Sequence, residues 1–271
     1  MAPFYYLWPA HGGSSGTAID PDVQTYITNN SISDQTEIDA TNTFILGLKA
    51  NNFYTRIDRL NLMSPTSSAA ALADFFGGTA MTAVGSPTYA TTGFTTNGTS
   101  SYLNSGYTPN DSGKLTTNNF SYWVYLRSGT KGTSKYAMGA NNNLNGKPTY
   151  FGNDNPSYTF SPGTLLSQTY GTIGSAAGLI TGIKRSLNDQ NLYKNGTLIV
   201  QNTTSATLGT PIARPLYLMV NNNNNVANNF MPGEICFFMA ATGAFTDPEV
   251  STMYNLIQTF QTNVIVGGRQ V

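Results

Sequence analysis

The spacing of apolar residues near the start of the chain predicts two short helices. The first follows Asp20-Pro21, which supplies an N-cap and a proline at the first helical position, and it stops at Asn29-Asn30. The second follows Ser33-Asp34, with Glu37 placed three residues after the aspartate as in a capping box. The apolar faces consist of Val23, Tyr26 and Ile27 in the first helix and of Ile38, Thr41, Phe44, Ile45 and Leu48 in the second.

A strand is expected after the second helix, and a third helix is expected near the end of the chain. Residues 57–63 alternate apolar and polar side chains with period two, which predicts a strand. The run Thr246-Asp-Pro-Glu249 has the pattern of a capping box. The helix that it opens has an apolar stripe of Val250, Met253, Tyr254, Ile257 and Phe260.

Between these helices the pattern is that of many short strands, with the strongest apolar runs at 120–126, 215–220 and 235–240. Three Asn-Gly pairs favour type I′ hairpin turns, because both residue types tolerate the positive φ required there. These pairs are Asn97-Gly98, Asn145-Gly146 and Asn195-Gly196. We therefore predict a mainly β fold: an antiparallel jelly-roll β-sandwich, preceded by two short N-terminal helices and closed by a C-terminal helix.

Composition supports the mainly β fold class and argues against a nucleic-acid partner and a membrane span. Charged residues make up only 10% of the chain, well below the usual quarter, and glycine, asparagine, serine and threonine are abundant. The 13 basic and 13 acidic residues give no net charge, so a nucleic-acid partner is not expected. No stretch approaches the roughly 20 apolar residues of a membrane span.

Cysteine and histidine are too scarce for several kinds of site. Cys236 is the one cysteine, so it has no intrachain disulfide partner, and its apolar surroundings predict a buried strand. His11 is the one histidine, which excludes histidine-rich metal sites and most catalytic triads. The opening residues lack the basic start and apolar run of a secretory signal.

Residues 1–19 are predicted to form an extended N-terminal arm. It carries an aromatic cluster of Phe4, Tyr5, Tyr6 and Trp8, which the glycine- and serine-rich run 12–16 separates from the first helix. Exposed rings are unfavourable unless something buries them. They are expected either to anchor the chain in a partner subunit or to pack back on their own domain. If the arm is an anchor, residues 20–63 form a helical attachment region that leads into a strand, and residues 64–271 form the jelly-roll domain.

Five segments of the chain occur in an informative order: Phe120-Ser-Tyr-Trp-Val-Tyr-Leu, Leu192-Tyr-Lys-Asn-Gly-Thr-Leu-Ile-Val, Leu216-Tyr-Leu-Met-Val, Gly233-Glu-Ile-Cys-Phe-Phe and Phe245-Thr-Asp-Pro-Glu. This order resembles the closing half of laminin G-like, concanavalin A-like jelly-roll domains. In that family a hairpin with an Asn-Gly turn precedes a strand, a Gly-x-Ile strand follows, and a short helix ends the domain. The resemblance covers residues 64–265 and implies the same fold.

A second group of segments lies nearer the start: Phe44-Ile-Leu-Gly-Leu-Lys, Arg56-Ile-Asp-Arg-Leu-Asn-Leu-Met and Ser100-Ser-Tyr-Leu-Asn-Ser-Gly-Tyr. These segments are similar to jelly-roll modules in structural proteins of tailed bacteriophages. The resemblance implies a location in the virion, as a head fibre, tail fibre or receptor-binding subunit. The expected partners are other capsid or tail proteins, bound through the arm. Because fibres and spikes are usually symmetric, a homo-oligomer is expected, with a trimer preferred by analogy.

The fold family also includes β-glucanases, in which a Glu-x-Asp-x-Glu strand places two acids in one cleft, about 5 Å apart in retaining enzymes. The nearest match is Glu37-Ile-Asp39, but Thr41 and Asn42 stand where a second glutamate is needed, and the segment has helical spacing. We therefore do not expect an enzyme. Calcium requires clustered oxygen ligands. The polar runs 110–112 and 153–155 lack the spacing of a cage and are interpreted as turns, so no metal or cofactor is expected.

Loops rich in asparagine and aromatic residues are the remaining candidates for a binding site. Amides and carboxylates bond sugar hydroxyls while a ring stacks on the sugar face. The candidate ligand-binding residues are Asn143, Tyr150, Asn153, Asp154 and Tyr158, with 221–225 as the next segment to consider. The alternative is that these polar loops solvate the rim of the sandwich. Trp123 stands in a strong strand and is interpreted as a core residue.

Taken together, the sequence predicts a non-enzymatic virion structural protein whose displayed jelly roll binds host surface glycans. The alternatives are a secreted carbohydrate-binding module and a glycan hydrolase or lyase of the same fold.

Overall fold

The computed structural model describes residues 18–112, 114–116, 118–130, 132, 134–141, 149–154, 157–162, 169–172, 174–204, 212–242 and 245–269. Within this part of the chain the helices are α1 (Pro21–Asn29), α2 (Gln35–Ala50), α3 (Ser68–Leu72) and α4 (Asp247–Asn263), with the short 3-10 helices η1 (Tyr54–Arg56) and η2 (Pro109–Asp111).

The strands of the described residues form two sheets. Sheet A contains β1 (Ile57–Asn61), β3 (Thr88–Ala90), β4 (Gly93–Asn97), β6 (Phe120–Gly129), β11 (Gly178–Ser186), β12 (Asp189–Lys194), β13 (Thr197–Asn202) and β17 (Pro232–Thr242). Sheet B contains β2 (Thr82–Val84), β5 (Tyr102–Asn104), β7 (Lys135–Asn141), β8 (Thr149–Asp154), β9 (Ser157–Pro162), β10 (Thr169–Thr172), β14 (Tyr217–Leu218), β15 (Asn221–Asn223) and β16 (Val226–Asn228). The order in sheet A is β13-β12-β11-β6-β17-β4-β3, with β1 beside β17, and in sheet B it is β10-β9-β8-β7-β14-β5-β2.

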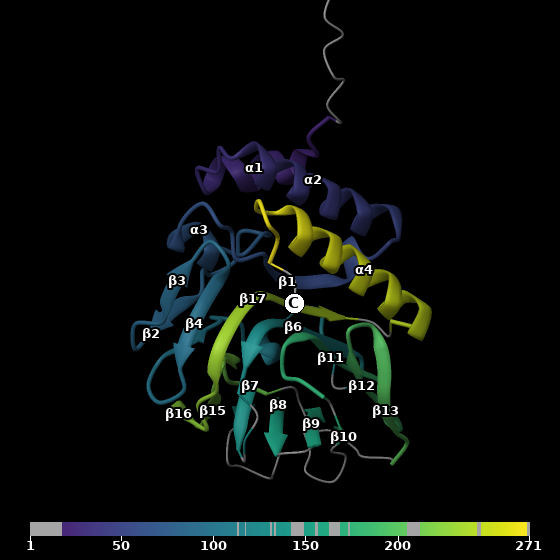
Figure 1. The fold of residues 1–271 in the computed structure, drawn as a ribbon. Coiled ribbons are helices and arrows are strands. Elements are labelled where there is room, and N and C mark those ends of the chain that lie inside the picture. Colours follow the sequence, from purple (N-terminus) through teal and green to yellow (C-terminus); the bar gives the residue numbers. More distant parts are fainter. Residues whose placement is uncertain are drawn as a thin grey trace, which may run out of the picture.

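The molecule has three layers, with sheet A in the middle (Figure 1). Helices α1, α2 and α4 cover one face of sheet A, and sheet B packs on the other face. Strand β6 serves both interfaces: Trp123 and Tyr125 point to the helices, while Tyr122, Val124 and Leu126 point to sheet B. The predicted mainly β sandwich, with two helices before it and one after it, is therefore confirmed.

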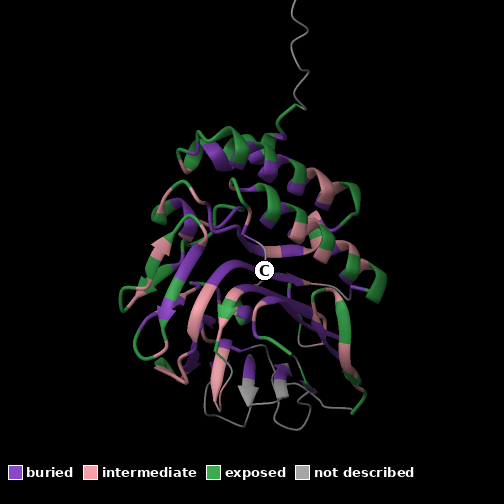
Figure 2. Ribbon diagram, in the orientation of Figure 1, coloured by how far each residue is buried: buried purple, intermediate pink, exposed green. Residues whose placement is uncertain are grey.

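Burial follows the same layering (Figure 2). The central strands of sheet A are buried along most of their length, whereas the helices expose one side. Trp123 is fully buried, which confirms its interpretation as a core residue, and Cys236 is buried in β17 as predicted. Because both faces of this sheet are covered, its strands are continuous apolar runs rather than alternating ones.

The predicted helix starts are confirmed, with one difference. Asp20 and Asp34 are the N-caps of α1 and α2, and Thr246 with Glu249 forms the capping box of α4. Glu37, however, does not complete a box in α2, because its carboxylate accepts a hydrogen bond of 2.6 Å from the Thr66 hydroxyl in a buried position. This tertiary contact replaces the hydrogen bond from Glu37 that would close the capping box. Burial raises the pKa of Glu37.

The prediction of a hairpin at Asn97-Gly98 is wrong. Strand β4 belongs to sheet A and β5 to sheet B, so the segment between them crosses from one sheet to the other. The Asn97 side chain accepts hydrogen bonds from the backbone N–H groups of three following residues, 99–101, and so stabilises a wider turn.

The hairpin predicted at Asn195-Gly196 is confirmed, since it joins β12 to β13 with φ values of 48° and 74°. The third pair, Asn145-Gly146, lies outside the described residues. The strands on either side of it, β7 and β8, pair antiparallel.

Two predicted strands differ in length or in exposure from what the pattern indicated. Strand β1 ends at Asn61, and its polar residues Arg59 and Asn61 are buried, where Arg59 Nε donates to Asn61 Oδ1 at 2.7 Å. The run 215–220 supplies only the two residues of β14, because Met219 takes a positive φ of 64° directly after it. Helix α3 was not predicted, since its five residues are too few to show a period.

A buried arginine at the end of the chain joins the last residues to the centre of the fold. The Arg269 guanidinium donates to the carbonyl oxygens of Met63 at 2.5 Å and Leu62 at 3.0 Å, and lies 5.5 Å from the Phe260 ring centre. Its own carbonyl accepts from Arg127 Nε at 2.9 Å. These contacts hold the segment after α4 against the end of β1.

Replacing Arg269 with alanine is expected to lower the free energy of unfolding by about 3 kcal/mol, because two buried carbonyl oxygens lose their donors. Urea unfolding followed by tryptophan fluorescence measures the change. The control is Arg214→Ala, which removes an exposed contact to Asn224 and should change stability by less than about 0.5 kcal/mol. Equal effects of the two substitutions would contradict this role for Arg269.

Candidate functional site

A cleft of about 390 Å³ opens between α1, η1 and the loop 73–80. Its size lies within the range of small-molecule sites, roughly 300 to 1,000 Å³. Three segments that are distant in the sequence meet there, and each supplies a different chemistry: α1 contributes amides and a carboxylate, η1 a phenol, and the loop a phenylalanine ring.

The loop side of the cleft is fixed by Asp74. One carboxylate oxygen of Asp74 accepts from Leu60 N at 3.0 Å and the other from Gly78 N at 3.0 Å. A side chain at Gly78 would place its Cβ only 2.6 Å from that second oxygen, so glycine is required for this close approach. The buried Arg59 guanidinium lies 3.7 Å from the same carboxylate.

Aromatic rings form one wall of the cleft. The Tyr26 and Phe75 ring centres lie 5.0 Å apart, and Phe76 lies 5.4 Å from both Phe75 and Tyr54. Tyr26 and Phe75 are buried, but Phe76 leaves 38% of its surface exposed. The buried rings therefore support one ring that is accessible at the edge of the cleft.

The lining of the cleft also carries a fixed carboxylate, that of Asp22. Lys49 Nζ lies 2.6 Å from Asp22 Oδ2 and 2.7 Å from Asp20 Oδ1, while the Tyr54 hydroxyl donates to Asp22 Oδ2 at 2.8 Å. The hydrogen bonds from Lys49 and Tyr54 lower the pKa of Asp22, so its carboxylate is ionised at neutral pH. The Asp22 side chain is 48% exposed and so remains accessible to a ligand.

Two amides complete this polar lining at the end of α1. Asn30 Nδ2 donates to the Tyr26 carbonyl at 2.8 Å, which leaves its Oδ1 as an acceptor. The Asn29 side chain is exposed and makes no hydrogen bond with the described part of the chain. An amide provides both donors and acceptors, so the cleft combines a ring, an amide and a carboxylate, which suit a polyhydroxylated ligand.

The glycan-binding residues predicted from the sequence are only partly placed by the structure. Asn143 lies outside the described residues. Tyr150, Asn153, Asp154 and Tyr158 belong to β8 and β9, where Asn153 and Tyr158 are partners in the antiparallel ladder, but their side chains lie outside the described part. The predicted binding site therefore stays a prediction. The predicted anchor of Phe4, Tyr5, Tyr6 and Trp8 also lies outside the described residues.

The asparagine run 221–225 forms a hairpin between β15 and β16. Asn224 and Asn225 turn the chain with φ values of 54° and 69°. Asn222 bonds to the Pro215 carbonyl and to Asn225 N, while Asn224 accepts from Arg214. The side-chain amides of Asn222 and Asn224 are therefore engaged in holding the turn.

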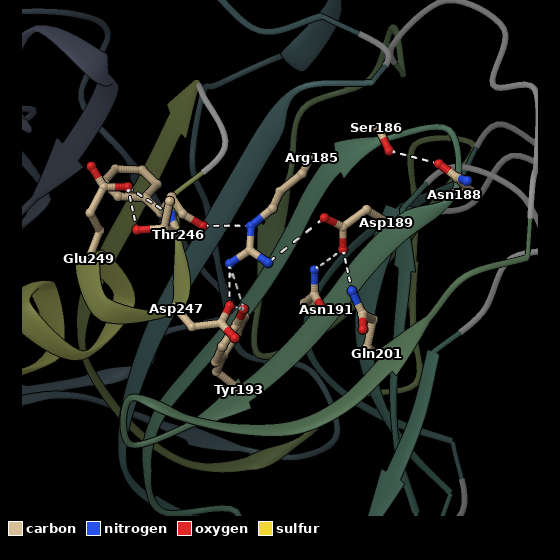
Figure 3. A network of polar contacts seen from close by, with 11 residues as sticks. Arg185, Ser186, Asn188, Asp189, Asn191, Tyr193, Gln201, Thr246, Asp247 and Glu249 are labelled. Atoms are coloured by element: carbon tan, nitrogen blue, oxygen red, sulfur yellow. Dashed lines mark hydrogen bonds and ion pairs between the residues drawn. The ribbon is translucent and has the colours of Figure 1, made fainter.

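A second polar cluster, at the start of α4, is shown in Figure 3. Arg185 Nε donates to the Phe245 carbonyl at 2.6 Å, and its Nη2 donates to Tyr193 Oη and Asp247 Oδ1, each at 2.7 Å. Asp189, which lies 3.8 Å from Arg185, also accepts from the amides of Asn191 and Gln201. The guanidinium and the carboxylates are bonded to one another, so we interpret the cluster as a clamp between the β11–β12 hairpin and α4.

The described residues contain no group of three or more histidine, cysteine, aspartate or glutamate side chains that could hold a metal ion. The run 110–112, one of the two loops considered for calcium, begins within η2. Among the helices of the described part, none is both long and apolar enough to cross a membrane.

Comparison with known proteins reveals likeness at the level of structure. No protein-family model matches the sequence, and no curated protein matches it. Domain 4 of AbnA, a GH43 extracellular arabinanase from Geobacillus stearothermophilus solved with arabinotriose, matches with a TM-score of 0.56 and 14% identity, covering 73% of this chain and 98% of that chain. Botulinum neurotoxin type C, in a structure concerned with its interaction with two ganglioside molecules, matches with a TM-score of 0.54 and 13% identity over 75% of this chain.

A mutant of Trypanosoma rangeli sialidase with trans-sialidase activity matches with a TM-score of 0.55 and 9% identity over 87% of this chain. This chain spans nearly all of the arabinanase domain, but only 51% of the neurotoxin chain and 38% of the sialidase chain. At these identities the likeness establishes the β-sandwich fold alone.

The clamp at α4 is expected to depend on pH. Hydrogen bonds from Tyr193 and then from Arg185 lower the pKa of Asp247 below its ordinary value of 3.8. Its contribution to stability is therefore present above pH 3.8 and is lost as the pH falls through the lowered pKa. Asp247 is 55% exposed, so solvent screening keeps this contribution at or below about 1 kcal/mol.

Asp247→Asn is expected to destabilise the chain at pH 7 and to have a smaller effect at about pH 2, because protonation of the native aspartate progressively removes the same ionic contact as the pH falls below 3.8. Urea unfolding at both pH values measures the difference, with Asn188→Ala in the same hairpin as a control that changes no charge. An equal loss of stability at both pH values would contradict the ionic role.

Proposed function

We propose that this chain is a non-catalytic glycan-binding β-sandwich module and that the cleft beside Phe76 is its binding site. The observation that carries the proposal is that one cleft is lined by the exposed Phe76 ring, the exposed Asn29 amide and the ionised Asp22 carboxylate. A ring stacks on the apolar face of a sugar, while the amide and the carboxylate bond its hydroxyl groups. The similar domain of an arabinanase, which was solved with arabinotriose, supports this choice of ligand.

The carboxylates of the cleft support a binding role rather than hydrolysis. A glycosidase needs one carboxylic acid that holds its proton near neutral pH, beside a second carboxylate. Asp22 has a lowered pKa, and both oxygens of Asp74 accept backbone hydrogen bonds. Glu37 has a raised pKa, but it lines a different pocket and bonds to Thr66.

The location in a virion is a further part of the proposal. It is supported by the resemblance of the segments that begin at Phe44, Arg56 and Ser100 to phage structural modules. In this proposal the N-terminal arm attaches the module to other virion proteins, as a homo-oligomer, and the sandwich is displayed outward.

Replacing Phe76 with alanine is expected to weaken glycan binding roughly five- to tenfold, because the stacked ring is lost, while the melting temperature changes little. Binding is measured by isothermal titration with glycans identified on a neutral and sialylated array. The matched control is Phe230→Ala, a half-exposed ring that packs against Tyr102 away from the cleft. No reducing sugar should be released from any bound glycan.

The competing site is the one predicted from the sequence. If Tyr150→Ala combined with Tyr158→Ala abolishes binding and Phe76→Ala leaves it unchanged, the cleft is not the binding site. Release of reducing sugar that an aspartate or glutamate substitution abolishes would overturn the non-catalytic assignment.

Deleting residues 1–16 is expected to abolish incorporation into particles while the purified sandwich keeps its cooperative melting, because the glycine- and serine-rich run 12–16 separates the aromatic cluster from α1 in the sequence. Fractionation of particles followed by immunoblotting locates the chain, and calorimetry measures melting. Particles that contain the shortened chain in normal amount would contradict the anchor.

A further inference from the structure

The cation that contacts the carboxylate of the cleft, Lys49, is already engaged by protein acceptors. Lys49 Nζ has three donors, and it has three carboxylate acceptors: Asp20 Oδ1 at 2.7 Å, Asp20 Oδ2 at 2.8 Å and Asp22 Oδ2 at 2.6 Å. No donor of this ammonium group remains for a ligand. The Lys49 charge lies 4.6 Å from the Tyr54 ring centre, so the phenol also covers it.

Arg59 is the second cation beneath the cleft, and it is buried, with only 3% of its surface exposed. Its Nε donates to Asn61 Oδ1 at 2.7 Å and one Nη donates to the Ser105 carbonyl at 2.9 Å. The other Nη faces Asp74 at 3.7 Å. The loop that contains Asp74 therefore separates this guanidinium from any ligand in the cleft.

Lys114 is the third cation nearby and lies outside the cleft lining. Its Nζ donates to the Ile57 carbonyl at 2.7 Å and lies 5.8 Å from the Phe76 ring centre. It is exposed beside the ring and is not one of the residues that line the cleft.

Among the side chains that line the cleft, those that remain available to a ligand are neutral or negative. They are the Asn29 amide, Asn30 Oδ1 and the partly exposed Asp22 carboxylate. Sugar hydroxyl groups can donate to the two oxygens and bond the amide. A ligand carboxylate placed in the same positions would face Asp22 and Asn30 Oδ1 without a cation to pair with.

We propose that the cleft selects uncharged sugars and rejects glycans that carry a carboxylate, such as sialylated or uronic-acid glycans. This inference rests on the proposed glycan-binding function and adds the class of ligand. The selection arises because the ionised Asp22 repels a ligand carboxylate, while all three donors of Lys49 are bonded to carboxylates of the protein.

The test compares neutral oligosaccharides with the same oligosaccharides capped by sialic acid or ending in a uronic acid. The native chain is expected to bind the neutral members at least tenfold more tightly than their acidic counterparts. The ratio of neutral to acidic affinity should fall as salt concentration rises, because Asp22 is partly exposed and salt screens its repulsion of the ligand.

Two substitutions shift the ratio in opposite directions. Asp22→Asn should bring it towards one, by removing the negative charge and freeing a Lys49 donor, while Asn29→Asp should increase it by adding a second carboxylate. Asp39→Asn is the matched control, since Asp39 is an exposed carboxylate of α2 that bonds to Gln35 outside the cleft. Melting temperatures verify folding, and Asn29→Asp tests the charge effect while the Lys49 ion pairs stay intact.

The possible failures are distinguishable. If acidic glycans bind as tightly as neutral ones, and Phe76→Ala weakens both, the charge selection is wrong and the glycan-binding function stands. If no glycan of either class binds, the proposed function fails and the selection fails with it. A neutral-to-acidic ratio that Asp22→Asn and Asp39→Asn change equally would also overturn the inference.

Discussion

Burial of sheet A on both faces is the constraint on which the other parts of this fold depend. A sandwich of two sheets needs only one apolar face on each. Here β6 and β17 are apolar on both faces, with Trp123 and Phe237 towards the helices and Val124 and Phe238 towards sheet B. Without α1, α2 and α4 the outer face of sheet A would be an exposed apolar surface. The helices are thus part of the folded core.

Local sequence was sufficient where the determining contacts are local. The Asp20 and Thr246 caps lie within one turn of the helices that they start, and Asn195-Gly196 needs only two positive φ values to connect its strands. Asn97-Gly98 has the same dipeptide but a different outcome. The strands on its two sides belong to different sheets, and that pairing is decided by partners such as β17 and β14, far away in the sequence.

The cleft was not predicted because no single segment contains it. Asp22, Tyr54 and Phe76 are separated by more than twenty residues at each step, and they meet only after α1 packs on α2. The one local signal is the run Asp74-Phe-Phe-Gly-Gly78, in which an exposed ring stands next to a glycine turn. The residues proposed from the sequence were chosen for composition within one segment, and composition does not report which distant side chains share a surface.

One set of ion pairs connects folding with the chemistry of the cleft. Lys49 of α2 binds Asp20 and Asp22, so it ties the start of α1 to α2, and α1 forms one side of the cleft. The same bonds occupy every donor of the lysine and hold Asp22 in its charged form. A site built in this way cannot offer its cation to an acidic ligand unless it gives up the contact that shapes it. Geometry and charge preference therefore follow from a single interaction.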